Sequence, residues 1–491
     1  MNVLTLLDMA ATGTPDRVGV GRLTYPELLD RARCGAALLV AHGVDELVYV
    51  GVNTDDFAVA LFAAAWAGVP LVPLNYRLSR DALESLLAHH PNALVIADLH
   101  VPATANTVTV AQWRASCAEP VGDVSPWSDD PGVVAVLLYT SGTTSEPKAA
   151  ILRHRHLTSY LLGSVEFGAA DEQEAVVVSV PPYHIAGVSN LLSNICAGRR
   201  VVYLETFTAQ GWLDCVRSER ITHALLVPTM LAKVTEYLGQ TANADVPTLR
   251  SLAYGGAKMP IPVLERAIRL FPTVDFVNAY GLTETSSTIA VLGPEDHRAA
   301  LQDDPVARAR LGSAGRVLPG IEVEIRGPGG SDGAAGDIHV RGEQVSGEYR
   351  GAGSSLDSDG WFATRDRGWV DEDGYLFVEG RSDDTIIRGG ENIAPAEIED
   401  VLLEHPAVAD VAVLGIPEAH WGQDIAAAVV FRPGHSASTE ELRQWARARL
   451  RGSRTPALIV VRDALPQTAT GKVLRRELLA DLLATELAPT T

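Results

Sequence analysis

The chain has 491 residues, of which 47% are hydrophobic and 21% are charged, and its formal net charge is −21. Single hydrophobic cores stop growing at roughly 250–300 residues, so this length predicts at least two domains, and the composition is that of a folded protein. The excess of acidic residues excludes a general nucleic-acid or anionic-membrane binder, because such proteins need a basic field.

The cysteines and the N-terminus indicate the compartment. Cys34, Cys117, Cys196 and Cys215 form no CxxC pair, so we expect buried small hydrophobic residues rather than a zinc site or disulfides. The N-terminus lacks the basic start of a signal peptide, and no stretch reaches the ~18 apolar residues of a membrane span. We therefore expect a cytoplasmic protein with no integral membrane segment.

Strand-like and helix-like segments alternate over about the first 280 residues. The expected strands are Leu47–Val52, Pro70–Leu74, Val133–Tyr139, Ala175–Val180, Arg200–Leu204, His223–Val227, Leu252–Tyr254 and Val274–Val277. The expected helices include Asp56–Ala67, Met230–Leu238 and Ile261–Phe271. Continuous apolar strands that alternate with helices indicate an α/β fold with two mostly parallel sheets, each covered on both faces.

The pattern changes after about residue 311. Residues 311–381 are rich in glycine and contain short alternating runs such as IEVEIRG and GDIHVRG, which predict a small, mostly antiparallel β-barrel subdomain. A small α+β domain follows, with expected helices and strands at Pro395–Leu403, Val408–Leu414, Asp424–Phe431, Thr439–Leu450 and Ala457–Val461. We place the N-terminal domain at residues 1–382, the boundary at Asp383 and the C-terminal domain at residues 384–491.

The segment YTSGTTSEPK, residues 139–148, directly follows an apolar strand. Its hydroxyls and backbone N–H groups are suited to wrapping phosphate oxygens, and Lys148 adds a positive charge. The segment is not a Walker A loop, because GxxxxGK[ST] is absent. On composition alone, a polar surface turn explains it equally well.

The segment NAYGLTET, residues 278–285, also lies at the end of a predicted strand, where open α/β sheets bind their ligands. Tyr280 is suited to stacking on a base. Glu284 is suited to holding Mg²⁺, which prefers a carboxylate together with phosphate oxygens. The alternative is an ordinary helix start, with Thr283 as its cap and Glu284 in its first turn.

Two later segments place charged residues in turns. GWFATRD contains Asp366, whose carboxylate can accept hydrogen bonds from a ribose diol, and GRSDD contains Arg381. TGKVLRR places Lys472 on a loop before a helix, from which its ammonium can reach a distant cleft. Each of these residues alone is more typical of a solvated surface than of a binding site.

In their order and spacing, the segments resemble the adenylate-forming superfamily of acyl- and aryl-CoA synthetases, adenylation domains of peptide synthetases and firefly-type luciferases. YTSGTTSEPKAA is similar to the family's phosphate loop, PPYHIAG to its aromatic and histidine motif, and YGGAKMP and NAYGLTETSS to its adenine and metal segments. GWFATRDRGWVDEDGYLFVEGRSDD is similar to its ribose and hinge segment, and RGGENIAPAEIE and QTATGKVLRREL to its C-terminal domain. The resemblance covers nearly the whole chain.

The resemblance implies roles for the matching residues. The phosphate-binding set is Thr140, Ser141, Gly142, Thr143, Thr144 and Lys148. The adenine-binding set is Gly255, Gly256, Ala257, Asn278, Ala279, Tyr280 and Gly281, and the ribose-binding pair is Asp366 and Arg381. The catalytic set is Lys472, Glu284, Thr283 and His184, with Glu284 and Thr144 at the metal. Asp383 is the implied hinge of a mobile C-terminal domain, and Gly389 and Gly390 line the implied thiol tunnel.

The implied reaction has two halves and uses ATP, Mg²⁺ and coenzyme A. A carboxylate attacks the α-phosphate, where Mg²⁺ and Lys472 offset the growing negative charge, and pyrophosphate leaves. The C-terminal domain then turns, and a thiolate displaces AMP from the acyl-adenylate to form an acyl-CoA thioester.

The implied acyl pocket is small and apolar apart from its histidine, asparagine and tyrosine, which favours a hydrophobic fatty, alicyclic or aryl acid. Its residues are His184, Gly187, Val188, Asn190, Leu191, Tyr254 and Ala257. Three residues depart from the family pattern, because Ser145, Ala149 and Arg365 stand where glycine is usual. A serine at a position that requires a positive φ would strain the loop, and Arg365 either alters the nucleotide contacts or points into water.

Several alternatives stay open. The acceptor could be a carrier-protein thiol or an amine rather than coenzyme A, and another oxyacid could replace the carboxylate. A luciferase-like oxygenase and a non-catalytic nucleotide-binding protein are further alternatives, although Glu284, Asp366 and Lys472 argue against the latter. Possible assemblies include a homodimer, which the sequence does not settle.

Overall fold

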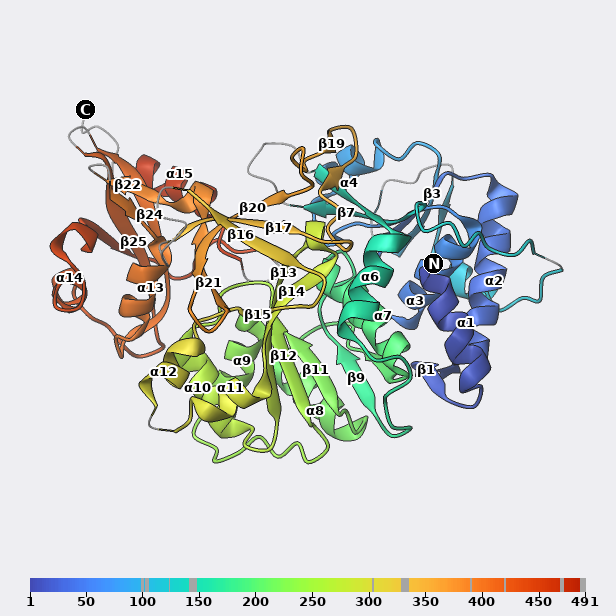
Figure 1. The fold of residues 1–491 in the computed structure, drawn as a ribbon, viewed down its shortest axis with the longest axis horizontal. Coiled ribbons are helices and arrows are strands. Elements are labelled where there is room, and N and C mark those ends of the chain that lie inside the picture. Colours follow the sequence, from blue (N-terminus) through green and yellow to red (C-terminus); the bar gives the residue numbers. More distant parts are fainter. Residues whose placement is uncertain are drawn as a thin grey trace.

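The computed structural model describes residues 1–98, 101, 106–122, 124–140, 148–302, 304–327, 335–388, 391–418, 421–468 and 472–485. Within this part of the chain, the N-terminal helices lie at one end of the molecule and the C-terminal elements at the other (Figure 1). Two large sheets and their helices fill the space between them. No helix in the described ranges is long and apolar enough to cross a membrane.

The smaller of the two large sheets has eight strands in the order β19-β18-β8-β7-β4-β3-β5-β6. Its strands are β3 (Glu46–Val50), β4 (Leu71–Pro73), β5 (Ala93–Ala97), β6 (Thr107–Val108), β7 (Val134–Thr140), β8 (Lys148–Arg153), β18 (Glu348–Tyr349) and β19 (Gly353–Ser354). The strands from β7 to β6 are parallel to one another, whereas β8, β18 and β19 are added in antiparallel pairs. The segment 348–354 thus joins a sheet that is otherwise built from the first 153 residues.

The larger sheet has thirteen strands in the order β16-β17-β20-β21-β15-β14-β13-β12-β11-β9-β10-β1-β2. Its strands are β1 (Val18–Val20), β2 (Leu23–Thr24), β9 (Ala175–Val178), β10 (Arg200–Tyr203), β11 (His223–Leu226), β12 (Ser251–Gly255), β13 (Asp275–Leu282), β14 (Ser287–Leu292), β15 (Gly315–Val317), β16 (Glu322–Arg326), β17 (Gly336–Arg341), β20 (Phe362–Val370) and β21 (Tyr375–Arg381). The run from β1 to β13 is parallel, and the strands beyond β13 are antiparallel.

Helices separate and cover these sheets. They are α1 (Val3–Gly13), α2 (Tyr25–His42), α3 (Asp55–Ala67), α4 (Arg80–Leu87), α5 (Val110–Ser116), α6 (His154–Ser164), α7 (Ile185–Ala197), α8 (Ala209–Ser218), α9 (Pro228–Leu238), α10 (Ile261–Leu270), α11 (Pro294–Ala299) and α12 (Pro305–Arg310). Alternate residues of one strand enter different cores: Leu47 and Tyr49 of β3 pack with α1–α3, whereas Val48 and Val50 pack with α4. Because Val176 and Val178 of β9 share the core of α1–α3, these helices lie between the two sheets.

The strands of residues 311–381 are antiparallel, as predicted, but a barrel is not confirmed. Among the described residues, β15, β21, β20, β17 and β16 continue the thirteen-stranded sheet as an open path that ends at β16. The pairing of β14 with both β13 and β15 provides the continuity. Alternation of apolar and polar residues indicates a strand with one buried face. Strands of an open sheet and of a barrel both have such a face, so the pattern does not distinguish them.

The C-terminal elements form a five-stranded sheet with cores on both faces. They are β22 (Ile386–Arg388), β23 (Glu391–Ile393), α13 (Pro395–Leu403), β24 (Val408–Glu418), β25 (Gly422–Phe431), α14 (Thr439–Arg447), β26 (Leu458–Val461) and α15 (Arg475–Thr485). One face packs on α13 and α14 and the other on α15. These separate cores agree with an independent unit, although the hinge at Asp383 stays a prediction.

The predicted strands and helices are all present, with boundaries that differ by a few residues. The largest extension is in β13, which we expected to end at Val277 and which continues to Leu282 because β14 pairs with it. Three cysteines are buried and Cys215 is half-buried, all with free thiols, as expected.

Candidate active site

The two ends of the predicted phosphate loop are held together by a β ladder. Thr140 at the end of β7 pairs with Lys148 at the start of β8, and Tyr139 pairs with Ala149. Ala149 is buried in this regular ladder, so the missing glycine requires no unusual backbone there. Ser141, Gly142, Thr143 and Thr144 lie outside the described residues, as does Ser145.

Glu284 is buried in a short 3₁₀ turn, Thr283–Thr285, immediately after β13. The hydroxyl of Tyr349 donates a hydrogen bond to Glu284 Oε1 (2.5 Å), and the backbone carbonyl of Glu284 accepts from the N–H of Ser346 (2.8 Å). The ammonium of Lys148 lies 6.0 Å from the centroid of the Tyr349 ring. The proposed metal ligand and the end of the phosphate loop therefore meet at Tyr349.

Asp366 and Arg381 lie opposite each other on β20 and β21. The guanidinium Nε of Arg381 is 3.2 Å from Asp366 Oδ1, and the hydroxyl of Tyr280 donates to Asp366 Oδ2 (2.7 Å). Burial raises the pKa of the Asp366 carboxyl, while Arg381, Tyr280 and then Lys472 act in the opposite direction. The predicted ribose pair and the predicted base-stacking tyrosine thus form one connected group.

The floor of the predicted adenine site is a close approach of two strands. Gly255 ends β12 opposite Ala279 of β13, and a Cβ at Gly255 would lie 2.2 Å from the Ala279 carbonyl oxygen. Gly256 follows with φ +84°, a conformation that favours glycine. The side chain of Asn278 donates to the carbonyl of Ser313 (3.0 Å), which fixes its orientation. A side chain is excluded at Gly255 by the close approach and disfavoured at Gly256 by its φ, so the strand ends can offer bare backbone to a flat ligand.

Lys472 is brought to this group from the C-terminal sheet. Its backbone N–H donates to the Thr468 hydroxyl (3.0 Å), and its C=O accepts from the Thr468 N–H (2.8 Å). Although Lys472 retains exposed surface, desolvation and then Arg381 lower the pKa of its ammonium, while Asp384 and Asp366 act to raise it. The charges of Lys472 and Asp366, 106 positions apart in the chain, therefore influence each other.

Backbone strain gathers at the same place. Five non-glycine residues in the described part of the chain have a positive φ, and three of them are Ser286 (+57°), Ser287 (+122°) and Arg365 (+62°). These three lie within three residues of Glu284 or Asp366. Arg365 occupies a register irregularity of β20, where glycine is the favoured residue. Such strain is typical of functional sites, where the surrounding structure holds it in place.

The predicted acyl-pocket residues divide into two groups. His184 is half-buried at the start of α7, with its ring centroid 4.4 Å from that of Tyr183, and burial followed by Arg77 lowers its pKa to about 4. Val188 and Leu191 are fully buried in the core between the sheets. A Cβ at Gly187 would lie 2.5 Å from the Pro181 carbonyl oxygen, which explains that glycine by packing.

The remaining predicted pocket residues have partners elsewhere. Tyr254 is fully buried, and its hydroxyl lies 2.9 Å from His297 Nε2. Asn190 accepts from the side chain of Asn194 (2.7 Å), and its own Nδ2 is buried with no hydrogen-bond partner among the described residues. The role of this set in binding an acid stays a prediction.

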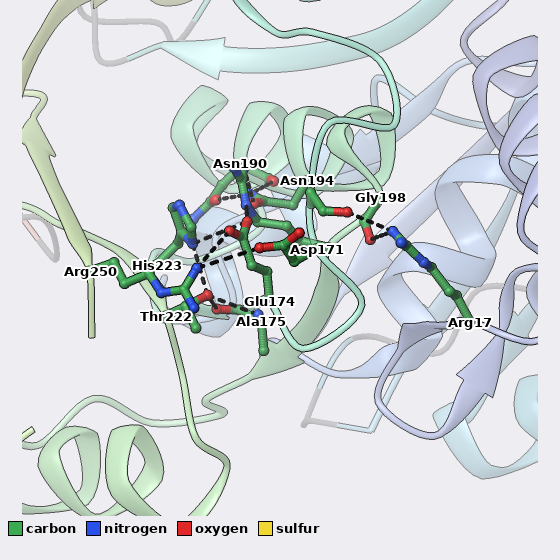
Figure 2. Close-up of polar contacts among 12 residues, drawn as sticks. Arg17, Asp171, Glu174, Ala175, Asn190, Asn194, Gly198, Thr222, His223 and Arg250 are labelled. Carbon is green, nitrogen blue, oxygen red and sulfur yellow. Dashed lines mark hydrogen bonds and ion pairs between the residues drawn. The ribbon is translucent and has the colours of Figure 1, made fainter. Parts of the chain in front are cut away.

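A second polar cluster lies at the other end of α7 (Figure 2). It centres on Glu174, which binds Arg199 (2.8 Å) and Arg250 (3.2 Å) and lies 3.9 Å from His223. Asn194 joins it through Arg199. These residues stand at or next to the first residues of parallel strands β9 to β12, whereas ligands of such sheets bind at the carboxyl ends.

Tyr349 is the site residue that sequence reasoning missed. Its contacts with Glu284 and Lys148 join segments 65 and about 200 residues apart, so no local pattern points to it. Asp366, Arg381 and Tyr280 are in contact with one another, and the roles predicted for them and for Lys472 and Glu284 stay predictions, whereas Gly389 and Gly390 lie outside the described residues. No group of three or more histidine, cysteine, aspartate or glutamate residues within the described ranges is arranged to hold a metal ion.

Comparison with known proteins agrees with this geometry. The chain matches the family model of the AMP-binding enzyme at residues 7–350 and that of the AMP-binding enzyme C-terminal domain at residues 397–472. These two matches cover most of the chain. The chain therefore belongs to the AMP-binding enzyme family.

Relatives in this family match the chain from end to end. Feruloyl-CoA synthase from an Amycolatopsis species is 35% identical over 487 residues, covering 96% of each chain. The fatty acid–[acyl-carrier-protein] ligase ScoC from Streptomyces coeruleorubidus is 32% identical, covering 95% of this chain and 93% of the relative. The solved structure of o-succinylbenzoate CoA synthetase from Bacillus subtilis with its acyl-adenylate intermediate has a TM-score of 0.83 at 29% identity, covering 96% of this chain and 97% of that one.

Proposed function

We propose that this protein is an acid–thiol ligase that converts a hydrophobic carboxylic acid, ATP and coenzyme A into an acyl-CoA thioester, AMP and pyrophosphate. The observation that carries the proposal is the contact of Asp366 with Arg381 and Tyr280, together with the influence of the Lys472 and Glu284 charges on the pKa of Asp366. A cation from the C-terminal sheet, a ribose-binding carboxylate and a buried glutamate are the groups that attack on an α-phosphate requires.

The residues fit MgATP as a substrate. Glu284 is a single buried carboxylate with Oε1 bonded to Tyr349, which suits an ion that binds one protein carboxylate and takes its other ligands from phosphates and water. Bound Mg²⁺ would supply charge neutralisation at the leaving pyrophosphate. Thr144 would be its second protein contact, and Lys148 would face the β- and γ-phosphates.

The first half-reaction follows from the charges of the site. Lys472 approaches both the acid carboxylate and the α-phosphate, so it offsets their repulsion. The carboxylate oxygen forms a bond to phosphorus while the bond to pyrophosphate breaks. Asp366 and Arg381 hold the ribose throughout, because neither belongs to the part of the chain after the hinge.

The second half-reaction requires Lys472 to leave. Asp383 is exposed in a short turn, Ser382–Asp384, and Arg475 links Asp384 to Glu399 through contacts of 3.5 and 2.5 Å. We propose that the C-terminal sheet turns about Asp383 and carries Lys472 away, after which a thiolate attacks the acyl carbon and AMP departs. Gly389 and Gly390 are the proposed lining of the thiol path.

We propose an aryl or fatty acid as the substrate, because the relatives are named for feruloyl, succinylbenzoate and fatty acyl groups. A second candidate differs only in the acceptor. The name of the ScoC relative supports an acyl-carrier-protein thiol in place of coenzyme A. A cytoplasmic location is a further proposal, supported by the few, reduced cysteines. A homodimer stays an open prediction.

The test is pyrophosphate release from MgATP with a panel of aryl, alicyclic and fatty acids, with and without coenzyme A. Acid-dependent release that becomes catalytic with coenzyme A, and a thioester identified by mass spectrometry, would establish the proposal. Release that responds only to an acyl-carrier protein would favour the second candidate. Absence of release with every acid would contradict both.

A further inference from the structure

A cluster of four polar side chains lies beside the first residue of the phosphate loop. His90 bonds through Nδ1 to Glu46 and through Nε2 to the hydroxyl of Tyr139 (2.9 Å). Arg350 Nη1 completes the cluster by donating to Glu46 Oε1 (2.6 Å). The side chain of His90 is fully buried and that of Glu46 is 10% exposed, whereas that of Arg350 is 41% exposed, so the cluster reaches from the interior to the surface.

The contacts favour one arrangement of the protons in this cluster. The Nδ1 of His90 faces a carboxylate oxygen of Glu46 and lies 3.2 Å from Arg350 Nη1, and a hydrogen on Nδ1 would be donated to the carboxylate. In the neutral ring, Nε2 then accepts from the Tyr139 hydroxyl. Burial raises the pKa of Tyr139, so its hydroxyl keeps its proton at neutral pH. The order of donors runs from Tyr139 through His90 to Glu46, where Arg350 supplies the balancing charge.

The cluster touches both ends of the phosphate loop. Tyr139 immediately precedes Thr140, where the loop begins, and pairs in β7 with Ala149, which follows Lys148 at the loop's other end. The backbone N–H of Arg350 donates to the Ala149 carbonyl (2.9 Å). The side chain of Tyr139 thus ties β7 to the cluster, and the backbone of Arg350 ties β8 to it. These are the two strands that the phosphate loop connects.

The cluster also adjoins the residue that holds Glu284. Tyr349 and Arg350 are consecutive, and the first donates to Glu284 while the second donates to Glu46. Neighbouring residues of extended chain point to opposite sides, so this segment links the predicted metal ligand on one side to the buried cluster on the other. Glu348, the preceding residue, fixes the segment further by a paired contact with Arg153 (2.7 and 2.8 Å).

We propose that Glu46, His90 and Arg350 are positioning residues that hold Thr140 and Lys148, the described ends of the phosphate loop, in place relative to Glu284 for binding MgATP. The proposal rests on the proposed function, since it assigns the loop to ATP. A cluster needed only for stability could be replaced by apolar residues at little cost, because buried ion pairs gain little over apolar packing. This cluster instead connects Tyr139, next to the start of the phosphate loop, with the segment Tyr349–Arg350, which contacts Glu284.

The chain contains a matched control for the test. His297 is also buried, and its Nε2 lies 2.9 Å from a tyrosine hydroxyl, that of Tyr254, at a ring separation of 5.7 Å compared with 5.8 Å for His90 and Tyr139. Its Nδ1 bonds to the Gly293 carbonyl (2.7 Å). His90→Gln and His297→Gln therefore remove similar contacts from two different places.

The experiment measures equilibrium binding of a non-hydrolysable MgATP analogue, which does not depend on turnover. We expect both variants to lower the melting temperature, but only His90→Gln to weaken nucleotide binding, by about tenfold. Tyr139→Phe, which removes one hydroxyl, should weaken binding about threefold in a stable protein. Arg350→Lys should retain more affinity than Arg350→Met.

Equal binding by wild type and His90→Gln, or equal weakening by His297→Gln, would overturn the proposal. If His90→Gln does not fold, unchanged binding by Tyr139→Phe would overturn it instead. A wild-type protein that binds MgATP but activates no acid would contradict the proposed function while leaving the positioning claim measurable. A wild-type protein that binds no MgATP would overturn both.

Discussion

Two glutamate-centred clusters of similar composition serve different parts of this molecule. Glu46 binds His90 and Arg350 next to the phosphate loop, and Glu174 binds Arg199 and Arg250 at the amino ends of the parallel strands. Both centre on a glutamate that is about 10% exposed and include an arginine that reaches the surface, and both join segments distant in sequence. The Glu46 cluster is linked to Glu284, because Arg350 is next to Tyr349 in the chain. The Glu174 cluster instead links the amino ends of parallel strands to Asn194 near the C-terminal end of α7. Chemical composition alone therefore does not tell a positioning cluster from a stabilising one.

The largest effect should come from Lys472, in the turn before α15. We expect Lys472→Ala to slow adenylation by about 10³-fold, because a positioned charge at the α-phosphate is lost. Thioester formation from a pre-made acyl-adenylate should stay within severalfold of wild type. The two half-reactions are measured separately, by pyrophosphate release and by mass spectrometry. Equal loss of both would contradict the role assigned to Lys472.

Acidification should weaken the fold through its buried histidines. Desolvation lowers the pKa values of His154, His156 and His184 to about 4, below the unfolded value of 6.5. The unfolded chain then binds more protons between these values, so stability is complete above about pH 6.5 and decreases as pH falls toward 4. A difference of one between the folded and unfolded pKa values of a group corresponds to about 1.4 kcal/mol of unfolding free energy. Identical urea midpoints at pH 7 and pH 5 would exclude this contribution.

Breaking the second cluster should affect stability but not nucleotide binding. Glu174→Gln leaves two arginines without their carboxylate, which we expect to cost about 2 kcal/mol in unfolding free energy. The KM for ATP should remain within twofold, because no contact of Glu174 approaches Glu284 or Asp366. Urea unfolding and steady-state kinetics on the same preparation provide the measurement. A tenfold rise in KM would remove the distinction between the clusters.

The smallest effect should be a gain in stability. Arg365→Gly relieves a non-glycine residue at φ +62°, which should raise the unfolding free energy by about 1 kcal/mol. Thermal unfolding with and without MgATP is the measurement. A lower melting temperature without nucleotide would show that the side chain contributes more than its backbone costs.

The sequence was sufficient for the elements and for the local part of the site. Apolar strands such as β9 and β11 were predictable because buried parallel strands need continuous apolar runs. Asp366 and Arg381 were paired only through the family resemblance, and the structure places them opposite each other on one hairpin. The closeness of Lys472 to Asp366 was accessible only through the family resemblance. Glu46 and Arg350 are 304 residues apart, and such a contact leaves no periodic signal in the chain. The barrel was predicted from an alternation that an open sheet produces equally well.

The most direct test of the central claim is mass spectrometry of the protein incubated with MgATP and an activated acid in the absence of any thiol. The account predicts an acyl-adenylate, with one pyrophosphate released for each adenylate formed, and conversion of that adenylate to thioester and AMP when coenzyme A is added. An acyl-phosphate accompanied by ADP, or an adenylate that no thiol can discharge, would contradict it.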